Sequence, residues 1–198
     1  MASVRKNSPQ KIGSKGLYMM KLGLKKNEVV LVPHEAGWKR EFAETKRKIM
    51  GHTNLQSYQI EHIGSTSIEG ISAKPVIDIV IGVENFNLLD KAFFIGLKEA
   101  GFYRLQVERP DEIVCAKFTD ASFETKTHFI HLVEFNKEKW HQMRFFRDYL
   151  NANEAVKKEY EALKNEFFST SMQGIADYTT YKEQFVQSIF KKMNEGIL

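Results

Sequence analysis

The sequence predicts a mixed α/β domain (α/β or α+β class), with one mixed β-sheet flanked by helices and a helical C-terminal third. Three observations support this class. An amphipathic segment precedes several β-branched apolar segments, only one further helical pattern interrupts those segments, and the last third carries helical apolar stripes. A chain of 198 residues with 42% hydrophobic content is long enough to bury one substantial core.

The first elements are a short strand and a helix. Residues 28–32 are mostly apolar and β-branched and end at a proline, which predicts a strand. Trp38, Phe42 and Ile49 then recur at helical spacing among charged residues, so we expect an amphipathic helix over residues 35–49.

The middle of the chain predicts the centre of the sheet. Residues 58–63 form the next strand candidate. Residues 75–83 are almost continuously apolar, which is typical of a strand covered on both faces, and the run is interrupted only by Asp78. Apolar residues between Leu88 and Leu97 then mark a helix that we expect Gly101 to terminate.

The remaining elements divide into strands and helices. Three strand candidates follow one another, at residues 102–108, 112–119 and 127–135, with a hairpin turn at Pro110-Asp111. Three helix candidates complete the chain, at residues 138–150, 154–170 and 178–194, the last two beginning after the caps Asn153 and Asp177. The aromatic stripes of these helices are expected to be core packing.

Charge divides the chain into a basic leader and a slightly acidic body. Residues 1–27 hold seven of the 29 Lys and Arg and no acidic residue, so residues 28–198 carry 22 basic and 25 acidic side chains. We expect residues 1–19 to be a disordered leader and residues 20–198 to be the domain, with an extension ahead of a natural start at Met20, or an organelle address, as further explanations of the leader. The acidic body makes general nucleic-acid binding unlikely.

The compartment is predicted from what the composition excludes. The single cysteine, Cys115, permits no intrachain disulfide and no cysteine-based zinc site. The sequence has no apolar stretch long enough for a membrane span and no apolar signal core. We therefore expect a cytoplasmic protein without a membrane partner.

A glycine turn is the first candidate ligand site. The segment HIGSTSIEGISAKPVIDI, residues 62–79, follows a predicted strand with Gly64 and Ser65, and glycine allows a ligand to approach the backbone closely. Backbone N–H groups and the hydroxyls of Ser65, Thr66 and Ser67 can converge on phosphate oxygens. Lys74 would neutralise the phosphate. An ordinary turn and a solvated lysine are the alternatives.

Asp78 is the second candidate, because a carboxylate inside an apolar strand is costly without compensation. We expect it to be the catalytic or cation-binding residue. The alternatives are a structural ion pair, for example with Lys74, and a cap at the strand end.

Together these residues resemble two groupings of known proteins. A hydrophobic-Gly-Ser turn, a spacer and an acidic residue on the next strand resemble the polymerase-β-like nucleotidyltransferases. The longer run EHIGSTSIEGISAKPVIDI, residues 61–79, is similar to the GrpB-like family, as are residues 127–134, 146–150 and 160–164. This resemblance implies a nucleotidyltransferase fold, and some proteins join a GrpB-like region to dephospho-CoA kinase.

One departure from the nucleotidyltransferase pattern concerns the metal. Active members carry two carboxylates at alternate strand positions, but here Val80 follows Asp78 at that spacing. Further ligands for a metal at Asp78 could come from Glu61, His128, His131 and Glu134, although a regular strand places His128 and Glu134 on one face and His131 on the other. Such a set would hold Mg²⁺ or Mn²⁺, or a transition metal such as Zn²⁺, and a structural role for each histidine stays open.

Two functions follow from these residues. The first is a nucleotidyltransferase-fold protein that binds a nucleotide or phosphorylated small molecule and carries out metal-dependent nucleotidyl transfer. The alternative is a non-catalytic nucleotide- or CoA-related binding or accessory module that lacks the second metal carboxylate. The oligomeric state is not specified by any of these patterns.

Overall fold

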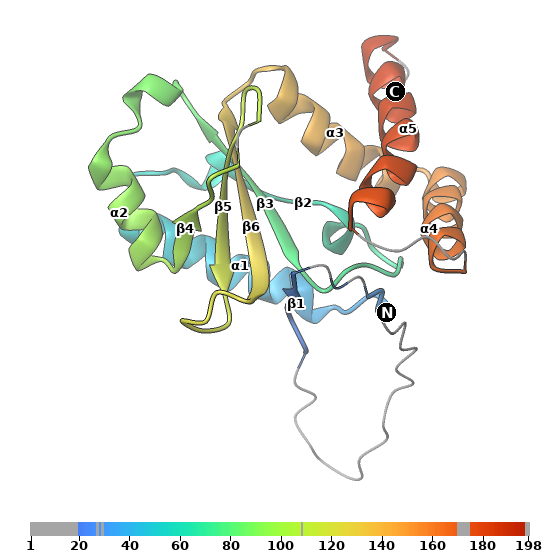
Figure 1. The fold of residues 1–198 in the computed structure, drawn as a ribbon. Helices are drawn as coiled ribbons and strands as arrows, with labels where there is room; N and C mark the ends of the chain where they lie inside the picture. The colour runs from blue at the N-terminus through green and yellow to red at the C-terminus, as the bar shows by residue number, and fades with distance from the viewer. Residues whose placement is uncertain (1–19, 27, 29, 108, 170–174, 197–198) are drawn as a thin grey trace.

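The computed structural model describes residues 20–196 except 27, 29, 108 and 170–174, and gives the backbone alone for 168–169 and 175–181 (Figure 1). The predicted leader, residues 1–19, lies outside the described residues. The strands are β1 (Leu24–Lys25), β2 (Ile60–Ile63), β3 (Ile77–Val83), β4 (Phe102–Arg104), β5 (Ile113–Phe118) and β6 (Thr125–Glu134). The α-helices are α1 (Gly37–His52), α2 (Lys91–Glu99), α3 (Glu138–Ala152), α4 (Glu154–Ser169) and α5 (Ile175–Asn194).

The strands form one mixed sheet in the order β2-β3-β6-β5-β4, with β1 paired to the beginning of β6. β3 and β6 run parallel, and the other pairs are antiparallel. The chain passes from β3 through α2 and the β4–β5 hairpin before β6 returns beside β3, so the two most buried strands are neighbours. The predicted mixed sheet flanked by helices is confirmed.

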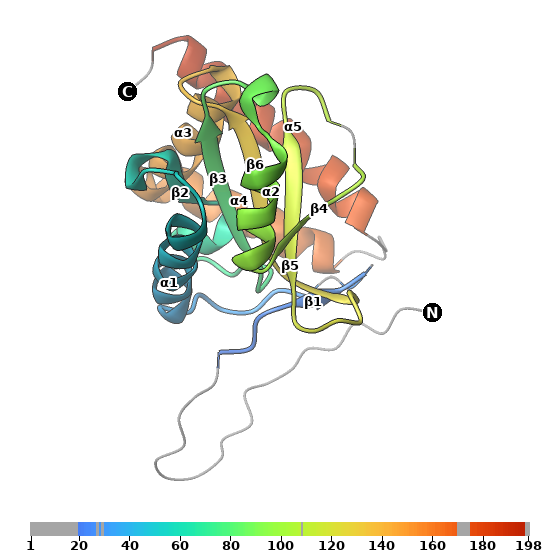
Figure 2. The same ribbon diagram turned by 90° about the vertical axis from the view of Figure 1, so that its left-hand side faces the viewer.

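Helices cover both faces of the sheet, with α1 and α2 on one side and α3, α4 and α5 on the other (Figures 1 and 2). The larger core lies under α1 and α2, where Trp38, Ile49 and Leu97 pack against the isoleucines of β3. A smaller cluster under α3 joins Val80 of β3 to Trp140. We call these two sides the core face and the helical face of the sheet.

The C-terminal helices have a core of their own. Phe146 of α3, Tyr160 of α4 and Phe185 of α5 pack together with Ile68 and Ile71, which lie in the segment between β2 and β3. The expected role of the aromatic stripes in packing is confirmed for these residues, and Tyr181 lies outside the described side chains.

Three sequence predictions of secondary structure were wrong in detail. Of the predicted strand 28–32, only Val32 makes a β-bridge among the described residues, to Ala73, because the sheet edge there is already occupied by β1. β4 ends at Arg104 instead of residue 108. Asp177 is not a helix cap, since α5 begins at Ile175. The Pro110-Asp111 turn is confirmed by the bridge from Arg109 to Glu112.

Candidate functional site

Strand register decides which side chains share a face with Asp78. Asp78 lies opposite Ile63 of β2 and Phe129 of β6, and Val80 lies opposite Glu61 and His131. Since side chains alternate along a strand, all of these belong to the helical face. Ile77 and Ile79 point to the core face, together with His128, which pairs with Ile77.

Gly64 brings the backbone against Asp78. Its φ of 71° and ψ of −176° are readily available only to glycine, and a Cβ at this position would overlap the Asp78 carboxylate and lie 2.9 Å from the Asp78 Cβ. The next three residues, Ser65–Ser67, form a single turn of 3₁₀-helix. The predicted turn at Gly64 is therefore confirmed, and the Asp78 carboxylate faces it.

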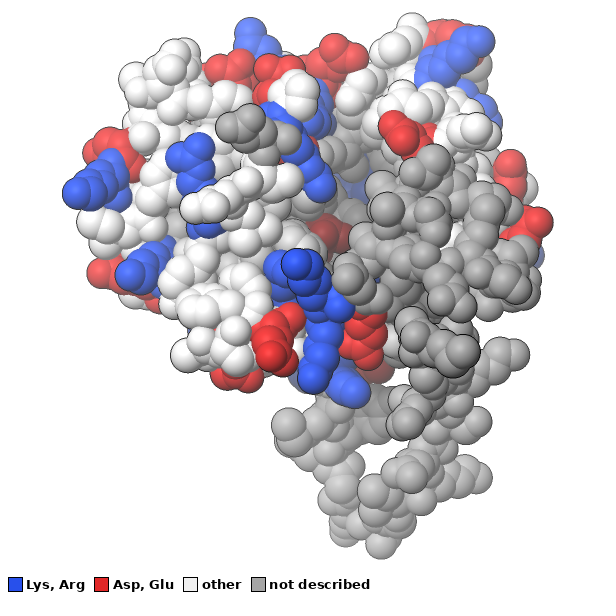
Figure 3. Space-filling model, in the orientation of Figure 1, with Lys and Arg blue, Asp and Glu red and all other residues white. Residues whose placement is uncertain are grey.

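A cavity of about 550 Å³ opens beside this turn, between the sheet and the helices α3 to α5. Gly64, Ser65, Thr66, Lys74 and Asp78 all line it. Its other cationic lining residues are Lys25, Lys26, Arg109, Lys126 and Lys182, and its other acidic one is Glu28. Lys and Arg side chains gather over β1 and the beginning of β6, with acidic side chains beside them (Figure 3).

The opposite part of the cavity lining is apolar. Five large apolar or aromatic side chains come from the sheet and the helices: Phe129, Met143, Phe146, Tyr160 and Phe190. A cationic part and an aromatic part within one cavity suit a ligand that combines an anionic group with a flat apolar one.

The three hydroxyls of the turn differ in their roles. Ser65 lines the cavity, with its Oγ 3.1 Å from the Tyr160 hydroxyl. Thr66 also lines the cavity, but its Oγ1 lies 3.0 Å from His62 Nε2 and donates to the Val76 carbonyl. Ser67 donates to the Gly64 carbonyl at 2.6 Å and is not a lining residue, so it supports the turn instead.

Asp78 begins a chain of alternating charges. The Asp78 carboxylate is 33% exposed, and His131 Nε2 lies 3.6 Å from it, an ion-pair distance too long for a good hydrogen bond. His131 Nδ1 lies 2.6 Å from Oε1 of Glu112, whose side chain is 3% exposed. Lys139 and Arg109 bind Glu112 in turn, at 3.0 and 3.2 Å.

These contacts shift two pKa values in opposite directions. Burial lowers the pKa of His131, but Asp78 and Glu112 outweigh it and raise that pKa to about 9. Burial raises the pKa of Glu112, but His131 and then Lys139 bring it down to about 2. At neutral pH, His131 is therefore a cation fixed between two carboxylates.

Lys74 enters the cavity from the segment before β3. Burial, followed by the neighbouring charge of Lys182, lowers its pKa to about 8, although Asp78 acts in the opposite direction. Two lysines held this close together favour an anion between them, because an anion relieves their mutual repulsion.

A divalent metal at Asp78 would need further donors, and the other predicted ligands are differently engaged. With both ring nitrogens protonated, His131 has no lone pair to offer. Glu61 shares the helical face but binds Arg147 Nη1 at 2.7 Å. Among the described residues, no three His, Cys, Asp or Glu side chains are placed to hold an ion.

The two other predicted ligands lie away from Asp78. His128 is on the core face, with Nε2 3.3 Å from Glu41 and 3.2 Å from the Thr45 hydroxyl. Glu134 pairs with Val83 at the far end of β3. The donors around Asp78 do not fit a two-metal centre, and the divalent metal stays a prediction.

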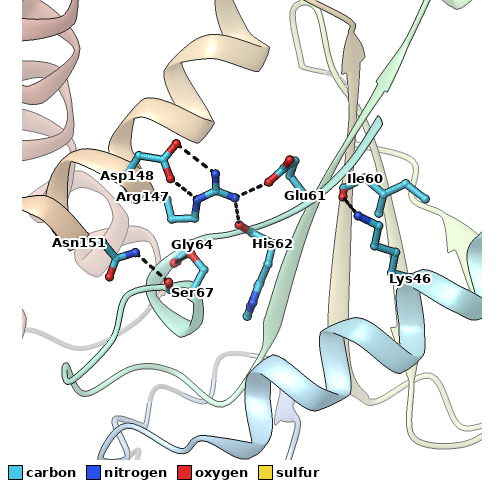
Figure 4. A network of polar contacts seen from close by, with 9 residues as sticks. All are labelled: Lys46, Ile60, Glu61, His62, Gly64, Ser67, Arg147, Asp148 and Asn151. Atoms are coloured by element: carbon cyan, nitrogen blue, oxygen red, sulfur yellow. Dashed lines mark hydrogen bonds and ion pairs between the residues drawn. The ribbon is translucent and has the colours of Figure 1, made fainter. Parts of the chain in front are cut away.

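Two important residues were missed from the sequence. Glu112 is the buried partner of His131, and Arg147 of α3 holds β2 through Glu61 and the His62 carbonyl, at 2.7 and 2.8 Å (Figure 4). The alternation of Glu112 with Val114 on one face of β5 was a usable signal for the first. Arg147 looked like any helix-surface arginine.

The fold and cavity together define the class: a mixed α/β domain with a cation-rich ligand cavity beside a glycine turn. The GrpB protein family model matches residues 28–192. The chain belongs to the GrpB family. It is 44% identical to the glutamate-rich protein GrpB of Alkalihalophilus pseudofirmus, over 87% of this chain and 99% of that protein. It is also 31% identical to a UPF0157 protein of Deinococcus radiodurans, over 84% of this chain and 83% of that protein.

Among solved structures, GrpB from Enterococcus faecalis aligns with a TM-score of 0.71 and 23% identity, over 82% of this chain and 96% of its own. This likeness supports the fold. A cytoplasmic RNA terminal U-transferase aligns less well, with a TM-score of 0.46 and 13% identity, over 69% of this chain and 41% of its own. No helix in the described part of the chain is long and apolar enough to cross a membrane.

Proposed function

We propose that this protein binds a phosphorylated small molecule, and specifically a nucleotide, in the cavity beside Gly64. The observation that supports this most strongly is the lining itself, which gathers six Lys and Arg side chains against two carboxylates around about 550 Å³. Such an excess of fixed cations attracts an anion, and phosphate is the common small anion that also carries a larger organic group.

The proposed pose divides the nucleotide between the two parts of the lining. The phosphates lie against Lys74, Lys126 and Lys182, with the Ser65 hydroxyl as a further donor. The base stacks within the aromatic part, near Phe146 and Phe190. A CoA-related ligand shares this chemistry, since it also joins a nucleotide to further phosphates.

Asp78 in this pose accepts a hydrogen bond from a hydroxyl or amine of the ligand. Because His131 already supplies a counter-ion 3.6 Å away, the carboxylate can remain charged in the cavity without a metal. This arrangement favours the binding or accessory module over metal-dependent nucleotidyl transfer. Transfer would require at least one further metal ligand beside Asp78.

Calorimetric titration with ATP and with CoA tests the proposal, in EDTA and again with Mg²⁺ or Mn²⁺. We expect binding in both conditions and about tenfold weaker affinity in the double variant Lys26→Glu, Lys126→Glu. The matched control is Lys98→Glu, an exposed lysine of α2 on the other side of the sheet. Absence of binding by the wild type to both compounds would contradict the proposal.

Release of pyrophosphate from ATP under Mg²⁺ or Mn²⁺ separates the two versions of the function. The binding-module version predicts none above background. Release that disappears in Asp78→Asn would instead establish transfer and show that the missing metal ligand is supplied from elsewhere.

A further inference from the structure

The segment that forms one wall of the cavity is held in place by side chains of α3 and α4. This segment, residues 62–72, follows β2 and leads to Lys74, and we call it the site loop. Its printed backbone hydrogen bonds within itself are only those of one 3₁₀ turn, from Ser67 N–H to the Gly64 carbonyl and from Ile68 N–H to the Ser65 carbonyl. Its conformation must therefore be set largely by other parts of the protein.

Helix α3 holds the first half of the site loop at two places (Figure 4). Arg147 Nη1 donates to the His62 carbonyl at 2.8 Å, while its remaining nitrogens are fixed by Asp148. Asn151 holds the turn with both ends of its amide. It donates to the Ser67 carbonyl at 3.1 Å and accepts from the Glu69 N–H at 2.9 Å.

Helix α4 holds the second half through a single peptide group. Glu161 accepts from the Ser72 N–H at 2.9 Å, and Lys164 Nζ donates to the Ser72 carbonyl. Lys164 is fully buried, and burial lowers its pKa to about 8. A buried lysine is an unfavourable choice for packing alone, so the contact with Ser72 requires a reason beyond the core.

The residues that line the cavity lie between or next to these attachment points. Gly64, Ser65 and Thr66 lie between the His62 and Ser67 contacts, and Lys74 lies two residues beyond Ser72. A wall that is fixed before the ligand arrives loses less conformational entropy on binding, so its rigidity contributes directly to affinity.

We propose that Arg147, Asn151 and the Glu161–Lys164 pair are positioning residues, which fix the site loop in the conformation that binds the phosphorylated ligand. This inference rests on the proposed function, because it assigns these residues to the same cavity. It gives the helical C-terminal third a role at a site whose ligand contacts come largely from the sheet side.

A purely structural role predicts something different. If these contacts only attach the helices to the sheet, weakening one of them lowers the melting temperature but leaves the affinity of the folded protein unchanged. If they position the site loop, affinity and local backbone exchange change together, even where the melting temperature hardly moves.

The test uses Asn151→Ala and Arg147→Lys, with Gln142→Ala as control. Asn151 is exposed, so its truncation should leave the fold intact, and Gln142 lies on the same helix but contacts Glu138 instead of the loop. ATP affinity is measured by calorimetry, and amide hydrogen exchange of residues 65–72 is measured without ligand. Asn151→Asp serves as the conservative variant, since it keeps the acceptor for Glu69 and loses the donor for Ser67.

We expect exchange in the site loop to accelerate at least tenfold and ATP affinity to fall about tenfold in Asn151→Ala and Arg147→Lys. Asn151→Asp should recover part of both, and Gln142→Ala should match the wild type. Unchanged exchange, or unchanged affinity together with faster exchange, would overturn the positioning role. If the wild type binds neither ATP nor CoA, the proposed function fails instead, and faster loop exchange in the variants still shows that these residues fix the loop.

Discussion

The two faces of β3 and β6 meet different demands with the same strands. On the core face, Ile77, Ile79 and Ile130 are completely buried in the main cluster. On the helical face, the alternate positions include Asp78 and His131, a charged pair next to a cavity. One face of the sheet therefore supplies the core, and the other supplies most of the chemistry.

The two histidines of β6 show the same contrast at closer range. Burial lowers the pKa of His128, which lies on the core face beside Glu41 and Thr45. Three residues later, His131 lies on the helical face between two carboxylates, and its pKa is raised to about 9. Identical side chains thus carry different charges because strand alternation gives them different neighbours.

The largest expected effect distinguishes the two faces of β3 directly. Ile79→Ala on the core face should lower the free energy of unfolding by about 3 kcal/mol, because it leaves a cavity in the main core. Asp78→Asn on the helical face should change it by about 1 kcal/mol or less, since that carboxylate is one-third exposed. Urea unfolding of the two variants measures the difference. Equal losses would mean that Asp78 serves the fold as much as Ile79 does.

A second comparison removes the carboxylate partner of each histidine. Glu112→Gln should cost about 3 kcal/mol, because it removes one charge from a buried group of ion pairs with His131 and Lys139. Glu41→Gln, which affects His128, should cost only about 1 kcal/mol, since Glu41 is more exposed. Urea unfolding at pH 7 again gives both values. The reverse order would contradict the proposed charge of His131.

The pH dependence of stability should have opposite signs for the two faces. Burial lowers the pKa of His62, on the core face, to about 4. Between pH 4 and 6.5 the unfolded chain binds more protons there, so stability should rise with pH. The pKa of His131 is raised to about 9, so its contribution is complete below pH 6.5 and is lost as the pH rises towards 9. Above pH 8, the lowered pKa of Lys74 and of Lys164 acts in the opposite direction.

Variants isolate each side of this pH profile. Melting temperatures between pH 4 and 9 should show that His62→Gln weakens the rise at acidic pH, whereas His131→Gln weakens the fall between pH 6.5 and 8. At still lower pH, the stability that Glu112 contributes should be lost as the pH falls from about 4.5 towards 2, since its folded pKa is about 2. A fall between pH 6.5 and 8 that persists in His131→Gln would assign it to other groups.

The smallest expected effect concerns the contact between the glycine turn and α4. Ser65→Ala and Tyr160→Phe should each cost about 1 kcal/mol, because each removes one side of the 3.1 Å contact between their hydroxyls. The double variant should cost little more than either single one. Additive losses in urea unfolding would show that the two hydroxyls do not interact.

The sequence was sufficient for the class of fold and for the turn at the site. The apolar run around Asp78 predicted a central strand, and Gly64 predicted the close approach that the structure contains. Strand alternation also predicted that His128 and His131 lie on opposite faces. Which of them meets Asp78 depends on the pairing of β3 with β6, and no local pattern encodes that register.

Long-range partners account for most of what was missed. Arg147 and Glu61 are 86 residues apart in the chain, and nothing near either residue indicates the other. Glu112 becomes buried only because Lys139 and His131 converge on it from other elements. Residues 28–32 had strand propensity, but the partner position at the sheet edge belongs to β1, and tertiary context overrides propensity there.

The most direct measurement of the central claim is a map of backbone amide chemical-shift changes on titration with ATP. A ligand held on the helical face should shift the amides of Gly64, Ser65, Lys74, Asp78 and Phe129, and should leave the buried core-face residues of α1 and α2 unchanged. Changes confined to the core side of the sheet, or no changes around Gly64 and Asp78 at saturating ATP, would contradict the assignment of the cavity as the ligand site.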